Sequence, residues 1–496
     1  MRYGNDFHLT DLAAIASARF DGTCEWITDD PRYKQWSSSS SSATLWIEAG
    51  PGAGKTILAS YIIIHQRAFS NQQCFYYFFK GTDSYRHTPL AAAKCLLSQA
   101  YSYCQRERPD IVAKELDTLA AAVIEDGYAK SRSFEITWAI FVSFVSSIGN
   151  CRVIIDGLDE CSQPSLFLNL LLTLSAECAT PVAITCRSGI VTMDLNSIDT
   201  VQVLSLGSSH HGDLSLYIAH RASRLTARVP LDLRTAIVDR LIEKHNGMFL
   251  WVCLVFEELE SIVTLKELRG ALRDLPEGID EVYHKIIQNL NMLSKPNRRL
   301  CHKTFTWLCA CQRPLRLDWL YEAMRFEYQE EDEEGFFHTP QSLAEAIKTA
   351  FGPLVIVEAD VVVFVHFTLK QFLDTAAVSG TVPFQFEIRA QQAHRHLLQV
   401  ALSYMESTKA AQYFGSSRPA KAIVDRATLD ADSTGQQLLG YCTFHWIDHL
   451  MACDISPKAI QILSRFGTAS SSLVWGYLVL ILDGPSLDPS SGTWNP

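Results

Sequence analysis

The chain has 496 residues, of which 48% are hydrophobic and 20% are charged, and its formal net charge is −11. This composition is that of a soluble globular protein, and the length predicts about three or four domains instead of one core. The negative net charge argues against a nucleic-acid-binding surface, so we expect no nucleic-acid partner.

No segment of the sequence predicts secretion or a membrane span. The N-terminus lacks a charged region followed by an apolar one, and the longest late apolar run, residues 473–482, is too short to cross a bilayer. We therefore expect a cytoplasmic protein whose 14 cysteines stay reduced and serve as small buried side chains. His445 and His449 have the spacing of zinc ligands on a helix, but Trp446 stands where a general-base glutamate would be needed, which disfavours a metal site.

The first 43 residues are predicted to form an N-terminal helix and a linker. Residues 9–36 have the pattern of a helix followed by a compact turn segment, and the serines at 37–42 are expected to form a flexible connection. From Leu45 onwards, short apolar runs alternate with amphipathic helical patterns, which predicts a parallel α/β sheet. The apolar runs are 45–49, 74–79, 152–156, 182–186 and 200–206.

The first apolar run leads into a glycine-rich turn, which holds Gly50, Gly52 and Gly54 and is followed by Lys55 and Thr56. Backbone N–H groups of such a turn, and of the helix after it, hold phosphates. The lysine reaches the outer phosphates, and the threonine hydroxyl binds Mg²⁺. This segment therefore predicts a phosphate-binding loop.

The third apolar run ends at Asp156 and is followed by further acids. Asp156 is predicted to supply a second contact to Mg²⁺, and an acid beyond it to orient the attacking water. Because the two motifs are independent requirements, together they predict a site for a nucleoside triphosphate with magnesium. The strict loop pattern has glycine at position 49, where this chain has Ala49; affinity would fall if that position needed a positive φ.

After Leu206 the predicted strands stop, and helices continue to Met292 with a break at Gly247. From Arg298 to about residue 377, two helices, an acidic loop at 329–335 and a hairpin running into a helix predict a winged helix. The chain is then predicted to be helical over 386–465 and disordered over 484–496. The predicted domains are 1–43, helix and linker; 44–207, P-loop NTPase core; 208–295, helical domain; 296–385, winged-helix-like domain; and 386–496, helical C-terminal segment.

Together these stretches resemble fungal NACHT-type signal-transducing NTPases, the STAND-class, NLR-like proteins whose core is similar to the nephrocystin-3-like N-terminal domain. The resemblance rests on segments that follow the family's order over about residues 20–450: GTCEWITDDPRYKQW, LWIEAGPGAGKT, VIIDGLDEC, ITCRSG, GMFLWVCLV, LPEGIDEVYHKI and FVHFTLKQFL. It implies an α/β P-loop NTPase sheet followed by a helical domain, a winged-helix domain and a helical tail.

The resemblance also implies roles for individual residues. Lys55 and Thr56 match the phosphate-binding positions, and Asp156 matches the magnesium acid. Asp159 and Glu160 match the acids that position the water.

Two further positions lie beyond these motifs. Arg187 matches the sensor arginine that contacts the terminal phosphate, although Ser188 stands where relatives often have proline. His366 matches the winged-helix histidine that touches the diphosphate in the resting state; by composition alone it would be an ordinary core histidine. Met248 and Phe249 replace a glycine-x-proline contact to the base, so base contacts there are not expected to follow the family.

The leading interpretation is a nucleotide-dependent molecular switch that binds ATP or ADP with Mg²⁺, with GTP as an open alternative. The resemblance implies slow hydrolysis, a homo-oligomer in the ATP-bound state, and protein partners in self/non-self recognition or cell-death signalling. Two alternatives stay open: a scaffold with a decayed nucleotide site, and a stand-alone ATPase or kinase. Relatives usually carry an N-terminal effector domain and C-terminal repeats, which this sequence does not show; we expect a trimmed gene or a switch module with separate partners.

Overall fold

The computed structural model describes residues 5–69, 72–81, 83, 86–112, 134–190, 195, 198–207, 210–225, 229–328, 337, 339–358, 360–379, 383, 386–406 and 437–453. The chain divides into two units, Met1–Val282 and Tyr283–Pro496. The predicted domain boundaries are finer than this division, and they stay predictions.

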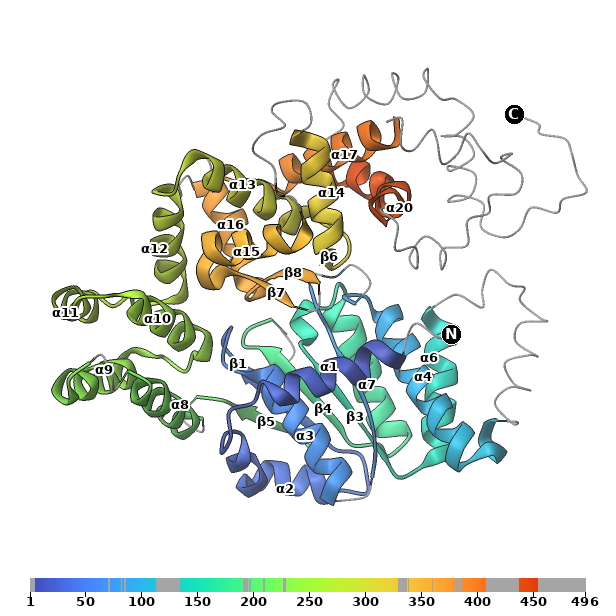
Figure 1. Cartoon of the computed structure of the whole chain (residues 1–496). Coiled ribbons are helices and arrows are strands. Elements are labelled where there is room, and N and C mark those ends of the chain that lie inside the picture. The colour runs from blue at the N-terminus through green and yellow to red at the C-terminus, as the bar shows by residue number, and fades with distance from the viewer. Residues whose placement is uncertain are drawn as a thin grey trace, which may run out of the picture. The chain divides into compact units, whose positions relative to one another are not determined.

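The first unit is built on a five-stranded parallel sheet with the strand order β2-β3-β4-β1-β5 (Figure 1). Each predicted apolar run forms a strand, so the predicted fold class, a parallel α/β sheet followed by helices, is confirmed. Strands that are buried on both faces read as nearly continuous apolar runs, which is why the sequence signal was strong. The strands are β1 (Thr44–Ala49), β2 (Gln73–Phe78), β3 (Cys151–Asp156), β4 (Val182–Arg187) and β5 (Val201–Ser205).

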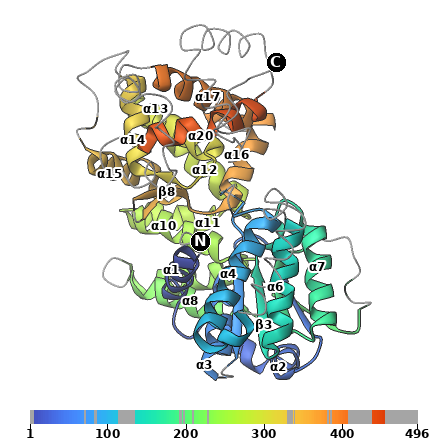
Figure 2. The same ribbon diagram turned by 90° about the vertical axis from the view of Figure 1, so that its right-hand side faces the viewer.

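Helices cover both faces of this sheet. Successive side chains of a strand point to opposite faces, and along β2 Phe75 and Tyr77 join one core while Tyr76 and Phe78 join the other. The helices of the first face lie side by side over β3 in Figure 2; they are α4 (Pro89–Glu107), α6 (Phe134–Ile148) and α7 (Pro164–Glu177). The helices of the second face are α1 (Asn5–Ser17), α2 (Pro31–Ser38) and α3 (Lys55–Phe69).

The N-terminal segment is more helical than predicted. A 3-10 turn, η1 (Glu25–Asp29), and helix α2 occupy most of the predicted compact turn segment, 22–36, and α2 continues into the serine run as far as Ser38. Asp30 is the N-cap of α2, because its carboxylate accepts a hydrogen bond from the Arg32 N–H at 2.9 Å. Pro31 then fills the first helical position, where the missing N–H costs nothing.

After the sheet, the described residues of the first unit are mainly helical, as predicted. Gly247, with a φ of +77°, separates two of its helices at the predicted break. α12 (Ile279–Asn291) runs across the boundary between the two units. The preceding helices are α8 (His211–Ser223), α9 (Leu231–Lys244), α10 (Phe249–Ser261) and α11 (Leu265–Arg273).

The second unit combines helices with a small antiparallel sheet of order β6-β8-β7. The predicted hairpin is confirmed, since β7 (Val355–Glu358) and β8 (Val361–Phe364) pair antiparallel, and β6 (Leu315–Arg316) adds a third strand that was not predicted. The helices are α13 (Lys295–Ala310), α14 (Leu317–Tyr328), α15 (Pro340–Phe351), α16 (Phe367–Ser379), α17 (Ala390–Glu406) and α20 (Gln437–Ala452).

Helix α15 is the main element that was not predicted from the sequence. Its start carries clear local signals, because Thr339 and Ser342 form a capping box and Pro340 occupies the first position. Its apolar stripe, which includes Leu343 and Ile347, is buried. The acidic run before it, 329–335, is predicted to be a loop; that run and the predicted disordered end lie outside the described residues.

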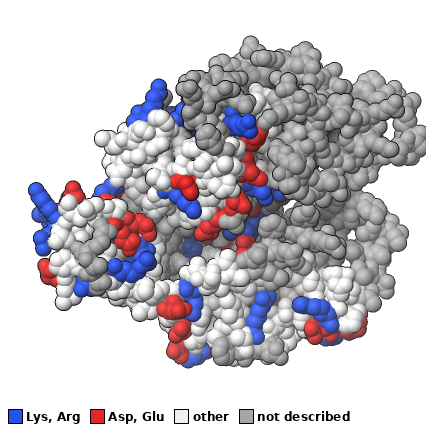
Figure 3. Space-filling view, in the orientation of Figure 1, with Lys and Arg blue, Asp and Glu red and all other residues white. Residues whose placement is uncertain are grey.

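All 14 cysteines lie among the described residues, and most are buried, as predicted. None of the described helices is long and apolar enough to cross a bilayer. His445 and His449 lie buried on α20, and within the described part of the chain no cluster of three or more potential ligands could hold a metal ion. On the described part of the face in Figure 3, basic and acidic side chains intermingle and do not gather into one basic surface.

Candidate nucleotide site

The glycine-rich turn joins β1 to α3 at the carboxyl edge of the sheet. Gly52 and Gly54 have φ angles of +66° and +86°, left-handed conformations that favour glycine. Because α3 begins at Lys55, the N–H groups of its first turn have no partner within the helix and can donate hydrogen bonds to an anion at this edge. The local fold is therefore that of a phosphate-binding loop.

Ala49 does not strain this loop. It is the last residue of β1, pairs with Arg187 of β4, and is not among the described non-glycine residues with a positive φ. The strand conformation suits alanine, so the departure from the strict glycine pattern gives no structural reason for weaker binding.

The Lys55 ammonium lies over the loop itself. Its Nζ donates to the carbonyl oxygens of Gly50 at 2.9 Å and Ala49 at 3.1 Å. Burial lowers the pKa of Lys55, while the nearby carboxylates Asp159 and Asp156 act in the opposite direction. Phosphate oxygens at the loop would likewise favour the charged form of this lysine.

Asp156 ends β3 and connects the loop to the acidic strand. Only 3% of this residue is exposed; its Oδ2 accepts from the Thr56 hydroxyl at 2.8 Å and its Oδ1 from the Thr185 hydroxyl at 2.6 Å. Burial raises the pKa of Asp156 despite these hydrogen bonds. A buried carboxylate in this state gains from a neighbouring cation, and hydroxyl and carboxylate oxygens are the ligands that Mg²⁺ prefers. Thr56 and Asp156 therefore fit a magnesium ion.

Thr185 is a site residue that was not predicted from the sequence. It receives a hydrogen bond from the Gly157 N–H at 3.0 Å while donating to Asp156, so it fixes both the carboxylate and the turn that follows. The available signal was a single polar residue inside the apolar run Val182–Cys186.

Glu160 lies beyond that turn, in η3 (Leu158–Glu160), and faces the loop after β2. Its Oε2 accepts from the Gly81 N–H at 2.7 Å. Burial raises the pKa of Glu160 to about 7; Gly81 opposes this shift, and Asp159 and Asp156 reinforce it. A carboxyl group poised near neutral pH suits proton transfer or the orientation of water.

Asp159 is held by Arg187. Its Oδ2 lies 2.9 Å from the Arg187 Nε, and its Oδ1 accepts from the Arg187 backbone N–H at 3.0 Å. The pair fixes the guanidinium at the end of β4, beside the loop and the acidic strand. Asp159 is thus better suited to position Arg187 than to orient water, which favours Glu160 for the second role.

The start of α10 packs on the phosphate-binding loop. The Leu250 N–H donates to the Gly52 carbonyl at 3.1 Å, and a Cβ added at Gly52 would lie 2.7 Å from the Leu250 Cβ, so only glycine fits there. The Phe249 ring lies beside Gly54. Phe249 and Leu250 therefore touch the loop directly.

His366 belongs to the second unit, at the turn between β8 and α16. Its Nδ1 accepts from the Thr368 N–H at 3.2 Å and lies 2.9 Å from the Thr368 hydroxyl, which in turn lies 2.8 Å from the Tyr283 hydroxyl. In the neutral ring this places the proton on Nε2, the tautomer that can donate to an oxyanion. The other predicted site residues, from Gly50 to Arg187, gather at one edge of the first unit.

Comparison with known proteins supports the core assignment. Residues 22–188 match the family model described as Nephrocystin 3, N-terminal, which confirms the predicted resemblance for this segment. The chain is 24% identical over 483 residues to the vegetative incompatibility protein HET-E-1 of Podospora anserina, a match that covers 92% of this chain but only 34% of that protein. The chain thus spans about a third of the length of this relative.

Solved structures show only distant similarity. The Walker-type ATPase PABY2304 of Pyrococcus abyssi matches 72% of this chain and 96% of its own at 12% identity, with a TM-score of 0.33. Cdc6p of Pyrobaculum aerophilum matches 75% of this chain and 97% of its own at 12% identity, with a TM-score of 0.30.

Proposed function

We propose that this protein is an NLR-like molecular switch that binds ATP or ADP with Mg²⁺ and hydrolyses ATP slowly. The observation that carries the proposal is the hydrogen bond from Thr56 to Asp156, because it joins the phosphate-binding loop to the acidic strand. Lys55, Glu160 and Arg187 converge on the same edge. A scaffold with a decayed site would not need to keep these residues and their hydrogen bonds together.

Each residue has a role that its position allows. Lys55 and the first turn of α3 hold the phosphates, while Thr56 and Asp156 hold Mg²⁺. Bound Mg²⁺ would neutralise charge that develops on the transferred phosphate. Glu160 orients the water, and Arg187, positioned by Asp159, interacts with the terminal phosphate.

The switch requires that the nucleotide influence the helical parts of the chain. The contact from Leu250 to Gly52 supplies one route, because a change in the loop acts directly on the start of α10. A second route runs through His366, if the helices and hairpin of the second unit act as a winged helix that closes on a diphosphate. Binding energy specific to one state is what shifts such an equilibrium.

Titration of the purified chain with ATP, ADP and GTP, followed by measurement of turnover and of mass in solution, tests this proposal. A switch predicts tight binding, slow turnover and a larger mass with ATP than with ADP. Rapid turnover with unchanged mass would favour a stand-alone ATPase or kinase, and absent binding would favour a scaffold.

We expect hydrolysis to rise with pH until Glu160 is ionised. Its pKa of about 7 in the nucleotide-free protein means that the carboxylate is mostly protonated below neutral pH and cannot accept from water. The apparent kcat/KM, which reports groups of the free enzyme, should increase about tenfold per unit below pH 7 and level off above it. A flat profile between pH 5.5 and 8.5 would contradict this role.

Replacement of His366 by alanine is expected to speed ADP release. One hydrogen bond to a charged group contributes about 1.5–3 kcal/mol. Its loss from the closed, ADP-bound state alone would shift the equilibrium between the closed and open states by about 10–150-fold. The ADP off-rate, measured by displacement of a fluorescent analogue, should increase accordingly, and self-association with ATP should become easier.

His284→Ala provides a matched control for this variant, since His284 is another half-buried histidine of the second unit and stacks edge-on against Phe372. It should leave the ADP off-rate unchanged. Equal off-rates for His366→Ala and the parent, together with a lower melting temperature without nucleotide, would show that His366 is only a core residue.

A further inference from the structure

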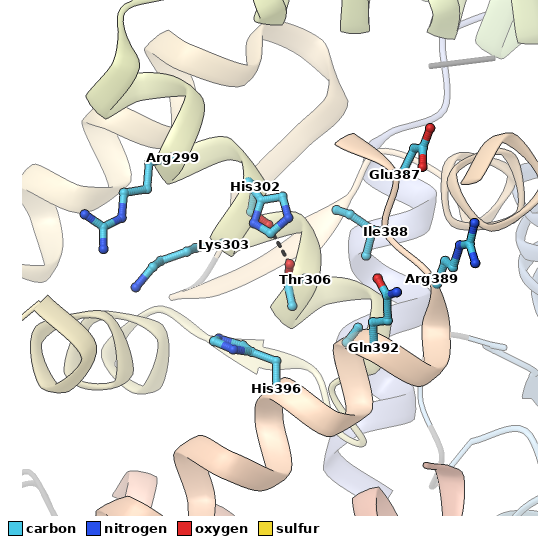
Figure 4. A pocket seen from close by; sticks show the side chains of 10 residues that line it. Arg299, His302, Lys303, Thr306, Glu387, Ile388, Arg389, Gln392 and His396 are labelled. Atoms are coloured by element: carbon cyan, nitrogen blue, oxygen red, sulfur yellow. Dashed lines mark hydrogen bonds between the residues drawn. The ribbon is translucent and has the colours of Figure 1, made fainter. Parts of the chain in front are cut away.

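The second unit contains a cavity of about 280 Å³ between α13 and the start of α17 (Figure 4). Its α13 side is one face of a helix, because Arg299, His302, Lys303 and Thr306 follow the spacing of successive turns. The volume lies near the lower end for ligand pockets, which predicts a small ligand.

The lining of this cavity is rich in positive charge. Three permanent cations, Arg299, Lys303 and Arg389, line it together with one carboxylate, Glu387. Figure 4 shows Arg299 and Lys303 on the same side as His396, with Glu387 and Arg389 on the opposite side. The partial positive charge at the N-terminus of α17 adds to this field.

The basic side of the cavity is held in place from behind. The side chain of Glu327 of α14 is only 10% exposed, and its Oε2 lies 2.6 Å from the Lys303 Nζ and 3.3 Å from the His396 Nε2. Burial would raise the pKa of Glu327, but His396 and Lys303 lower it overall. The carboxylate therefore stays charged and continues to hold the Lys303 and His396 side chains. Side chains that are already ordered lose less entropy when a ligand binds.

The rest of the lining is apolar or neutral. Ile388 and Ala393 are almost fully buried and form an apolar wall, and Gln392 adds an amide. The Thr306 hydroxyl donates to the His302 carbonyl at 2.8 Å within α13. A ligand for this cavity therefore carries strong negative charge at one end and a compact apolar part at the other.

We propose that this cavity binds a small organic phosphate, with its phosphate towards Arg299, Lys303 and His396 and its remaining part against Ile388 and Ala393. A phosphate offers more charge and more acceptor oxygens than a single carboxylate, and the two cationic side chains Arg299 and Lys303 match it best. Because α13 and α17 both line the cavity, such a ligand would tie the C-terminal helices to the rest of the second unit. The site is separate from the nucleotide site and does not depend on its assignment.

Inorganic pyrophosphate is a suitable probe for the charged half of this site. The full chain with Lys55→Ala, in EDTA, removes the lysine and the metal that would favour pyrophosphate at the phosphate-binding loop. Calorimetric titration of this variant should give a dissociation constant below about 1 mM. Addition of Arg299→Glu should weaken binding at least tenfold.

Two further variants make the test specific. Lys295→Glu makes the same kind of charge reversal on the same helix, one turn before Arg299, at an exposed residue outside the cavity, and it should weaken binding clearly less than Arg299→Glu does. Gln392→Trp places a large ring at an exposed position of the lining, and it should block binding without a change of charge. The proposal is overturned if the Lys55→Ala chain does not bind pyrophosphate, if Lys295→Glu weakens binding as much as Arg299→Glu, or if Gln392→Trp binds as tightly as its parent.

Discussion

Glu160→Gln is expected to bind ATP within about threefold of the parent and to hydrolyse it about 10²–10⁴-fold more slowly. The amide keeps the size of the side chain but removes the negative acceptor that can orient or deprotonate water. Its carbonyl can still accept from the Gly81 N–H, which binds the Glu160 carboxylate at 2.7 Å, so the loop after β2 should keep its position. Single-turnover hydrolysis and nucleotide titration of the same sample separate the two effects.

Asp159→Asn is the informative comparison. Asp159 contacts both the side chain and the backbone N–H of Arg187, so this variant should disturb the position of the arginine. The affinity for ATP relative to ADP should then fall, because Arg187 is proposed to contact the terminal phosphate. It should preserve the rise of the rate with pH, which we assign to Glu160. If Glu160→Gln hydrolyses ATP at the parent rate while Asp159→Asn is inactive, the water-orienting role belongs to Asp159.

Lys55→Ala is expected to abolish tight nucleotide binding. The Lys55 ammonium lies over the phosphate-binding loop, and no other lysine lies within the loop segment 49–56. A charge-assisted contact to several phosphate oxygens cannot be replaced by a methyl group. Equilibrium titration with ATP and Mg²⁺ should show an affinity loss well beyond tenfold.

Lys94→Ala serves as the control for Lys55→Ala, because Lys94 is an exposed lysine of α4. It should bind nucleotide like the parent. Binding by Lys55→Ala within about threefold of the parent, a loss of under about 0.7 kcal/mol, would show that the site assignment is wrong. The melting temperature without nucleotide should be compared as well, since Lys55 also donates to two backbone carbonyls.

The sequence by itself determined the sheet and the loop, because their signals are local. Strands that are buried on both faces must be apolar at nearly every position, so the runs that became β1 to β4 could be recognised one by one. The turn before Lys55 needs glycine at Gly52 and Gly54, where φ is positive, and that requirement is visible in the sequence. Helix α15 had local signals as well, which the neighbouring acidic run obscured.

Only the tertiary structure decided how the site residues work together. The hydrogen bonds from Thr56 and Thr185 to Asp156 bring together residues from α3, β4 and β3, and the bond from Gly81 to Glu160 joins segments 79 positions apart. The strand order β2-β3-β4-β1-β5 creates these neighbours, and no local pattern encodes it. Partner choice depends on which side chains the packed sheet brings within hydrogen-bond distance. For that reason the sequence named Asp159 and Arg187 separately, while the structure shows that one holds the other.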